Sequence, residues 1–168
     1  MRTFTYVDNK KGVTIIELMI TLAMILIVIG LSYLFYFYVV RSFEISSTQS
    51  AVQENVRLAK NLIDKEIRRA SYIKIEEPPD DVNKYNHHIM TADGKIKKDT
   101  NYLLGNLSEG VEMGLLFTKT SDSFIEVTVT GSIDGDYEYS ITSEVLALGG
   151  NIDNSINDSG DEIYFKYE

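Results

Sequence analysis

The stretch KKGVTIIELMITLAM, residues 10–24, opens an apolar run that contains a single charged side chain. Between Val13 and Val40, a span of 28 residues, Glu17 is the only acidic or basic residue. A carboxylate inside a membrane helix costs about 2.5–3.5 kcal/mol at the bilayer centre, so an isolated one marks a functional position. The run predicts a membrane helix in which Glu17 has a specific role.

The apolar run is long enough to cross a membrane and too long for a signal peptide. About 20 residues cross the hydrocarbon core, whereas the core of a secretory signal peptide has roughly 7–15. We therefore expect the run to remain as a single-pass anchor in the cytoplasmic membrane. Arg2, Lys10 and Lys11 precede it, and positive residues stay on the cytoplasmic side. The N-terminus is thus expected in the cytoplasm and the remainder outside.

Composition narrows the classes of function. The chain has 168 residues, no cysteine and a formal net charge of −9, of which residues 1–12 carry +2 and the rest −11. Contacts with phosphates need clustered Lys and Arg, so nucleic acid is not expected as a partner. The lack of cysteine excludes thiol chemistry. No catalytic constellation or phosphate-binding glycine loop is evident, and we expect no enzymatic activity.

A second helical pattern follows the apolar run without a break. Apolar residues recur at spacings of three and four between Ile45 and Ala70, mostly with charged residues between them. No proline occurs before Pro78, so the two patterns predict one helix from about Val13 to about Tyr72. The proline pair that begins at Pro78 cannot continue it.

The last third alternates apolar and polar residues, as β-strands do. In SFIEVTVTGSIDGDYEYSIT, residues 123–142, the alternation flanks the hairpin signal Asp134-Gly135. A three-residue loop, Ile133-Asp134-Gly135 with Gly135 left-handed, would set Val129 opposite Tyr139 and keep the faces unmixed. Further strands are expected near 111–118, 144–148 and 162–167, with at most one short strand in the polar stretch before Asn101. The predicted class is α+β, a long helix whose second half packs on an antiparallel sheet.

The N-terminal motif resembles a known processing site. Lys10-Lys11-Gly12 followed by VTIIEL is similar to the cleavage site of type IV prepilins and pseudopilins. In that family the prepilin peptidase, a membrane aspartyl protease, cuts after the glycine and N-methylates the new first residue. The resemblance implies cleavage after Gly12, methylation of Val13, and Glu17 as the acidic fifth residue of the mature chain. The family usually has phenylalanine or methionine where Val13 stands. A long helix with a C-terminal sheet is also the pilin-like fold.

This resemblance implies four regions and a set of partners. The regions are a leader, 1–12; the transmembrane and assembly half of the helix, 13–40; its amphipathic half, 41–73; and a globular β-rich region, 74–168. The implied partners are the prepilin peptidase, the cytoplasmic membrane, and other pilin or pseudopilin subunits that contact the N-terminal helix.

Physical chemistry gives Glu17 a role in assembly. The α-amine created at Val13 would be largely protonated near neutral pH, and Glu17 lies one helical turn away on the same face. When such helices stack with an axial offset, the carboxylate of one subunit can meet the amine of its neighbour. A buried charge without its partner is strongly destabilising, so the pair would fix the register. The alternative is a tolerated charge near the interface of an ordinary anchor.

The amphipathic helix suggests a subgroup. SSTQSAVQENVRLAKNLIDKEIRRASYI, residues 46–73, resembles the corresponding helix of minor subunits often called PilW-like or PulJ-like. The resemblance rests on Gln53, Val56, Arg57, Ala59, Ile67, Arg68, Arg69, Ala70, Ser71 and Tyr72. The alternative is a generic amphipathic helix.

Two further clusters contain side chains that can bind metals. His87 and His88 are adjacent, so they should not face one ligand, and a loop role is favoured over a metal. The segment NIDNSINDSGDE, residues 151–162, is rich in oxygen ligands but lacks EF-hand spacing, which favours a solvated turn. No cofactor is therefore expected, with calcium as the weaker alternative. Its candidate ligands are Asp153, Asn157, Asp158 and Asp161.

These features predict a structural protein. The expected function is that of a minor type IV pilin or pseudopilin, stored in the cytoplasmic membrane and built into or priming an extracytoplasmic filament for motility, secretion, DNA uptake or adhesion. The alternative is an uncleaved, membrane-anchored module whose exported domain binds a ligand.

Overall fold

The computed structural model describes residues 12–75, 85–105, 110–133, 135, 137–149, 151–152 and 159–167. The chain divides into two compact units, Met1–Ile45 and Ser46–Glu168. Helix α1 spans Ile15–Arg69 and contributes to both. In the first unit the helix is exposed at every described position up to Ile45.

The second unit combines the C-terminal part of α1 with two sheets. One sheet has the strand order β4-β3-β2-β10-β1-β8 and the other β7-β6-β5-β9. The pairing of β1 with β8 is parallel, and the other pairings are antiparallel. The strand bounds are β1 Ala70–Ile75, β2 His87–Ala92, β3 Lys95–Lys98, β4 Asn101–Tyr102, β5 Val111–Lys119, β6 Phe124–Ile133, β7 Tyr137–Leu146, β8 Asn151–Ile152, β9 Ser159–Gly160 and β10 Ile163–Tyr167. The predicted α+β class is confirmed, with two sheets in place of one.

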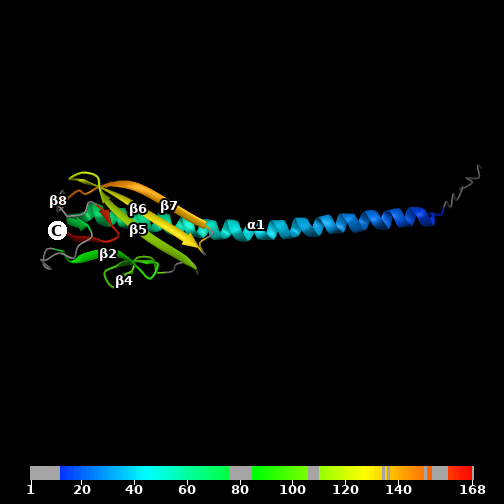
Figure 1. The fold of residues 1–168 in the computed structure, drawn as a ribbon, viewed down its shortest axis with the longest axis horizontal. Coiled ribbons are helices and arrows are strands. Elements are labelled where there is room, and N and C mark those ends of the chain that lie inside the picture. Colours follow the sequence, from blue (N-terminus) through cyan, green and yellow to red (C-terminus); the bar gives the residue numbers. More distant parts are fainter. Residues whose placement is uncertain are drawn as a thin grey trace, which may run out of the picture. The chain divides into compact units, whose positions relative to one another are not determined.

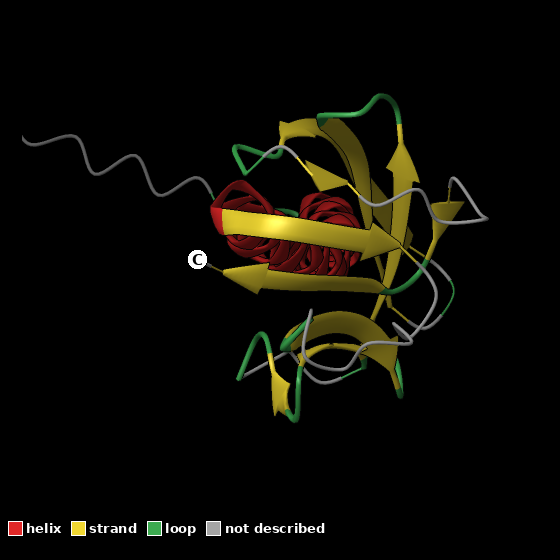
Figure 2. Cartoon of the chain, turned by 90° about the vertical axis from the view of Figure 1, so that its left-hand side faces the viewer, coloured by secondary structure: helices red, strands yellow, loops and turns green. Residues whose placement is uncertain are grey.

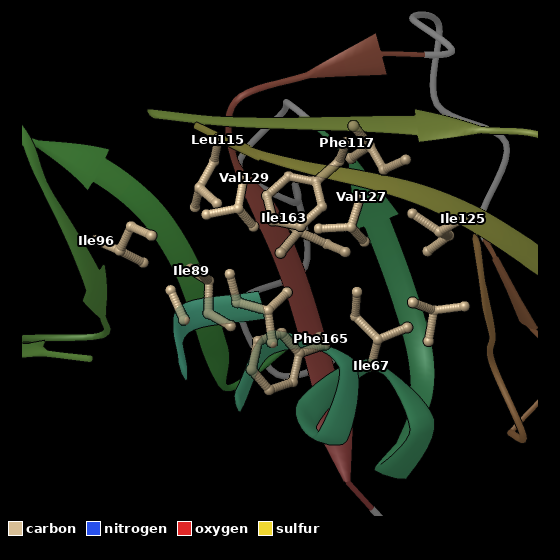
Figure 3. Close-up of a cluster of buried hydrophobic side chains, with 14 of the residues drawn as sticks. Ile67, Ile89, Ile96, Leu115, Phe117, Ile125, Val127, Val129, Ile163 and Phe165 are labelled. Atoms are coloured by element: carbon tan, nitrogen blue, oxygen red, sulfur yellow. The ribbon is translucent and has the colours of Figure 1, made fainter. Parts of the chain in front are cut away.

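The core forms where the helix meets the strands. Figure 1 shows β7 on one side of the helical segment, β2 and β4 on the other, and β5 and β6 running obliquely across it. Figure 3 shows Phe117 and Val127 pointing toward Ile163, with Phe165 and Ile67 on the opposite side of the cluster. The helix contributes a buried stripe at spacings of three and four, Val52, Val56, Ala59, Ile63 and Ile67. This stripe is the apolar face that the sequence predicted for the second half of the helix.

The end of α1 differs from the prediction. The helix ends at Arg69, and residues 70–73, expected to be helical, begin β1. Figure 2 shows β1 leaving the end of the helix directly, with β10 beside it. Ile73 and Ile75 are buried on one face of β1, and β1 pairs with β10 over its length. Tertiary pairing therefore ends the helix before the proline pair, which lies outside the described residues.

The polar stretch before Asn101 was expected to hold at most one short strand, but β2 and β3 form a hairpin there. Asp93 and Gly94 make its turn with positive φ angles of 55° and 65°. Asp-Gly is a strong hairpin signal, so the sequence contained the information. The strand β3 was not predicted because it is short and three of its four residues are lysines.

The β6–β7 hairpin keeps the predicted faces in a different register. Val129 pairs with Ile141, and Ile133 pairs with Tyr137, which leaves the three residues 134–136 as the connection. The predicted connection was 133–135, with Val129 opposite Tyr139. Gly135 has the expected left-handed conformation, with φ of 72°. The partners shift by two residues along β7, and a shift of two leaves every side chain on the same face.

Candidate processing and assembly site

The predicted cleavage point lies where the chain enters the helix. Gly12, Val13 and Thr14 precede α1 in non-helical conformation, and all three are exposed. No atom lies within 4 Å of a β-carbon built at Gly12. The Gly12–Val13 bond is therefore uncovered within the described part of the chain. Lys10 and Lys11 lie outside the described residues.

Thr14 and Glu17 form a cap at the start of α1. The Glu17 backbone N–H donates to Thr14 Oγ1 at 3.4 Å, and the Thr14 hydroxyl donates to Glu17 Oε2 at the same distance. The bond from the Glu17 N–H to the Thr14 side chain is one half of a capping box. The Glu17 carboxylate accepts from the Thr14 hydroxyl, where a full box would have it accept from the Thr14 backbone N–H. A carboxylate at this position is also stabilised by the positive end of the helix dipole. Glu17 thus lies in the first turn of the helix, one helical turn from Val13.

Sequence reasoning did not identify Thr14, although Thr-x-x-Glu before an apolar run is the usual signature of this cap.

The helix beyond the cap is long and apolar enough to cross a membrane by its length and composition, and none of its apolar window is buried. Its later part carries exposed aromatic rings. Tyr33 and Phe37 stack edge to face, with ring centroids 4.8 Å apart. An apolar surface of this extent requires lipid or neighbouring helices to cover it.

Comparison with known proteins bears directly on this segment. Residues 8–33 match the family model of the prokaryotic N-terminal methylation motif. The match includes Gly12, Val13, Thr14 and Glu17. The motif implies processing by a prepilin peptidase and assembly with pilin-type subunits.

A solved structure supports the fold. The chain is similar to a single-residue variant of the PilB minor pilin from Streptococcus sanguinis, with a TM-score of 0.50 and 17% sequence identity. The similarity covers 73% of this chain and 35% of that protein. No curated protein matches the chain significantly. The chain therefore carries a methylation motif and has a pilin-like α+β fold. Proteins of this kind are structural, in agreement with the expectation that the chain is not an enzyme.

The adjacent histidines lie differently from the prediction. They belong to β2, and both contact Asp99 at the end of β3: His87 Nδ1 lies 2.9 Å from Oδ2, and His88 Nδ1 lies 3.5 Å from Oδ1. The His88 backbone N–H also donates to Asp99 Oδ1 at 2.8 Å. Neighbouring strand residues point to opposite faces, but a carboxylate beyond the strand end reaches both. Asp99 has the positive φ of 55° that places it there.

Hydrogen bonding lowers the pKa of the Asp99 carboxyl. Burial alone would raise its pKa, but hydrogen bonds from His87 and from the His88 backbone outweigh burial and lower the pKa below its ordinary value. Among the described residues, no group of three or more histidine and acidic side chains is arranged to hold a metal. Of the calcium candidates, Asp161 is exposed, while Asp153, Asn157 and Asp158 lie outside the described residues.

A polar cluster that sequence reasoning missed lies at the C-terminal end of α1. Lys98 Nζ lies 2.9 Å from Glu66 Oε1 and donates to the Tyr167 hydroxyl at 2.8 Å. The Tyr167 hydroxyl donates in turn to Glu66 Oε2. Burial favours the neutral carboxyl of Glu66, yet the bonds from Tyr167 and Lys98 lower its pKa below the ordinary value. Together with Arg69, these three side chains line an open pocket of about 420 Å³. No sequence pattern connects residues this far apart.

Proposed function

We propose that this chain is a minor type IV pilin or pseudopilin of the PilW-like or PulJ-like kind. The prepilin peptidase cuts after Gly12 and methylates Val13, and the mature subunit joins or primes an extracytoplasmic filament. Before assembly the subunit is anchored in the cytoplasmic membrane with its N-terminus inside. The observation that carries this proposal is the methylation motif over residues 8–33, placed at the entrance of an exposed apolar helix.

The role proposed for Glu17 rests on the geometry of the helix start. Its carboxylate lies in the first turn of α1 and bonds only to Thr14 among the described residues. The Glu17 carboxylate can still bind a cation, because a carboxylate accepts up to about four hydrogen bonds. The methylated amine of an axially displaced neighbour would supply one. Charge-assisted bonds of this kind are about twice as strong as neutral ones.

The second candidate is an uncleaved anchored module whose exported domain binds a ligand. The open pocket at Glu66, Arg69, Lys98 and Tyr167 is the observation that favours it. The two proposals differ in the N-terminus of the mature protein.

The deciding experiment is the intact mass of the protein extracted from the membranes of a host with an active prepilin peptidase. Loss of residues 1–12 with the gain of one methyl group supports the pilin proposal. A Gly12→Leu variant serves as the control and should keep the full-length mass, because a large side chain replaces the glycine before the cleaved bond. A wild-type chain that retains its first twelve residues would contradict cleavage and favour the anchored module.

A further inference from the structure

The pocket at the end of α1 contains one positive charge that has no ion-pair partner among the described residues. Lys98 and Glu66 form an ion pair, whereas Arg69, at the last position of the helix, is exposed and makes no hydrogen bond or ion pair among the described residues. Glu66 attracts Arg69 only at longer range. The pocket therefore offers the planar donor fork of an arginine, which matches the geometry of a carboxylate.

The β7-β6-β5-β9 sheet carries a pair of exposed negative charges. Glu126 of β6 and Glu144 of β7 are directly opposite each other in the strand register. Both are exposed, and neither forms an ion pair with a described residue. The next pair on this face is Thr128 and Thr142, whose hydroxyls are 2.9 Å apart, so side chains of opposed residues meet here. Like charges directly opposite on a sheet are destabilising.

The register that places the two glutamates together is imposed from the other face of the sheet. Val127 and Val129 are fully buried, and a one-residue slip would expose them. The acidic pair is thus a fixed surface feature. Phe124, in the next row of the same face, is 38% exposed and places an apolar ring beside the two carboxylates.

We propose that the pocket of Arg69 is a carboxylate-binding site whose ligand is the Glu126–Glu144 pair of a second copy of this chain. Charge complementarity carries the assignment: neither Arg69 nor the glutamate pair has an ion-pair partner among the described residues of its own copy. The pocket uses β3 and β10 of one sheet, and the acidic pair lies on β6 and β7 of the other. A contact between two different surfaces is heterologous, so it would join two copies head to tail.

The inference goes beyond the proposed function, since neither cleavage at Gly12 nor the contact of Glu17 with an amine requires it. It adds a contact between exported regions that would help to fix how neighbouring subunits are oriented.

Cysteine crosslinking in the full-length chain tests the contact, because the natural sequence has no cysteine. One tagged copy carries Lys65→Cys, an exposed position one helical turn before Arg69. A second, differently tagged copy carries Thr142→Cys, exposed two residues before Glu144. The copies are coexpressed in the native host, and membranes are treated with a short bis-maleimide. We expect a crosslinked species that contains both tags.

Charge reversal identifies the groups that make the contact. Arg69→Glu in the first copy, or Glu126→Arg with Glu144→Arg in the second, should each reduce the crosslinked fraction by about tenfold or more, as expected for a charged contact at an interface. Combining both reversals should restore most of it. Arg68→Glu and Glu138→Arg are matched controls, because Arg68 does not line the pocket and Glu138 faces Ser132. Both controls should leave the crosslink unchanged.

Three results would overturn the proposal: no crosslink between correctly processed copies, a crosslink insensitive to Arg69→Glu, or a loss that the double reversal does not restore. In the last case the pocket takes its carboxylate from another source. Failure of cleavage would instead appear as a full-length mass, so the two proposals fail in distinguishable ways.

Discussion

Gly131 of β6 lies directly against Val56 of α1: a β-carbon built at Gly131 would come within 2.5 Å of Val56 Cγ2 and 3.1 Å of Val52 Cγ1. Tyr139 is the cross-strand partner of Gly131 and packs at the edge of the same core. The absence of a side chain at one position of β6 thus sets how closely the sheet approaches the helix.

Gly131→Ala should destabilise the globular region by about 1–3 kcal/mol, because the added methyl group overpacks a contact between two rigid elements. The measurement is urea unfolding of the detergent-solubilised protein, followed by tyrosine fluorescence since the chain has no tryptophan. Gly114→Ala is the matched control, because the nearest neighbour of its β-carbon would be Thr130 Cβ at 4.0 Å. Equal effects of the two substitutions would contradict the argument.

Tyr167→Phe should cost about 1–2 kcal/mol, because it removes a hydroxyl that bonds Glu66 and Lys98 in a half-buried cluster. Tyr164→Phe provides the comparison. Its hydroxyl donates only to Glu162, two residues away at 2.8 Å, and its loss should cost less. Urea unfolding at neutral pH measures both, and a larger effect at Tyr164 would argue against the cluster as a stabilising unit.

Asp99→Asn should destabilise the protein by about 1 kcal/mol near neutral pH, and by less in acid below the ordinary aspartate pKa. The pKa of Asp99 is lowered in the folded state, so its contribution is present above the ordinary aspartate value. That contribution is lost as pH falls through the lowered one. Asparagine tolerates the left-handed backbone at this position, so the substitution isolates the charge.

Asp122→Asn is the control for that experiment. The Asp122 side chain is 99% exposed and pairs with Lys119 at 3.3 Å, and exposed pairs contribute little. The free energy of unfolding of Asp122→Asn should match that of the wild type at neutral pH and in acid. A pH-independent effect of Asp99→Asn would contradict a role for the carboxylate charge.

Glu17 combines two roles that substitutions can separate. Glu17→Gln keeps a side-chain oxygen that can accept from the Thr14 hydroxyl but removes the charge, whereas Glu17→Ala removes both. We expect hydrogen exchange at the start of α1 to increase only in the alanine variant, while the filament fraction loses the subunit in both. Full incorporation of the glutamine variant would show that the carboxylate charge is not required for assembly.

The sequence could point to a candidate processing and assembly site because the residues of that site are close together in the chain. Gly12, Val13 and Glu17 lie within one short segment, and the Thr14 cap was also readable there. The helix stripe from Val52 to Ile67 followed from its spacing for the same reason. The Glu66–Lys98–Tyr167 cluster could not be predicted in this way, since its members meet only after three distant segments have packed.

The amino-acid sequence by itself determined the apolar helix, its isolated carboxylate, the buried stripe and the alternation of β5, β6 and β7, because each depends on periodicity along a continuous segment. Tertiary structure decided where α1 stops, which strands enter each sheet and how β6 aligns with β7. Those outcomes depend on pairing between separated segments: β10 captures residues 70–75 as a strand, and the approach of Val56 requires a glycine at residue 131. Hydrogen bonding and close packing across long sequence separations outweigh local preference at these points.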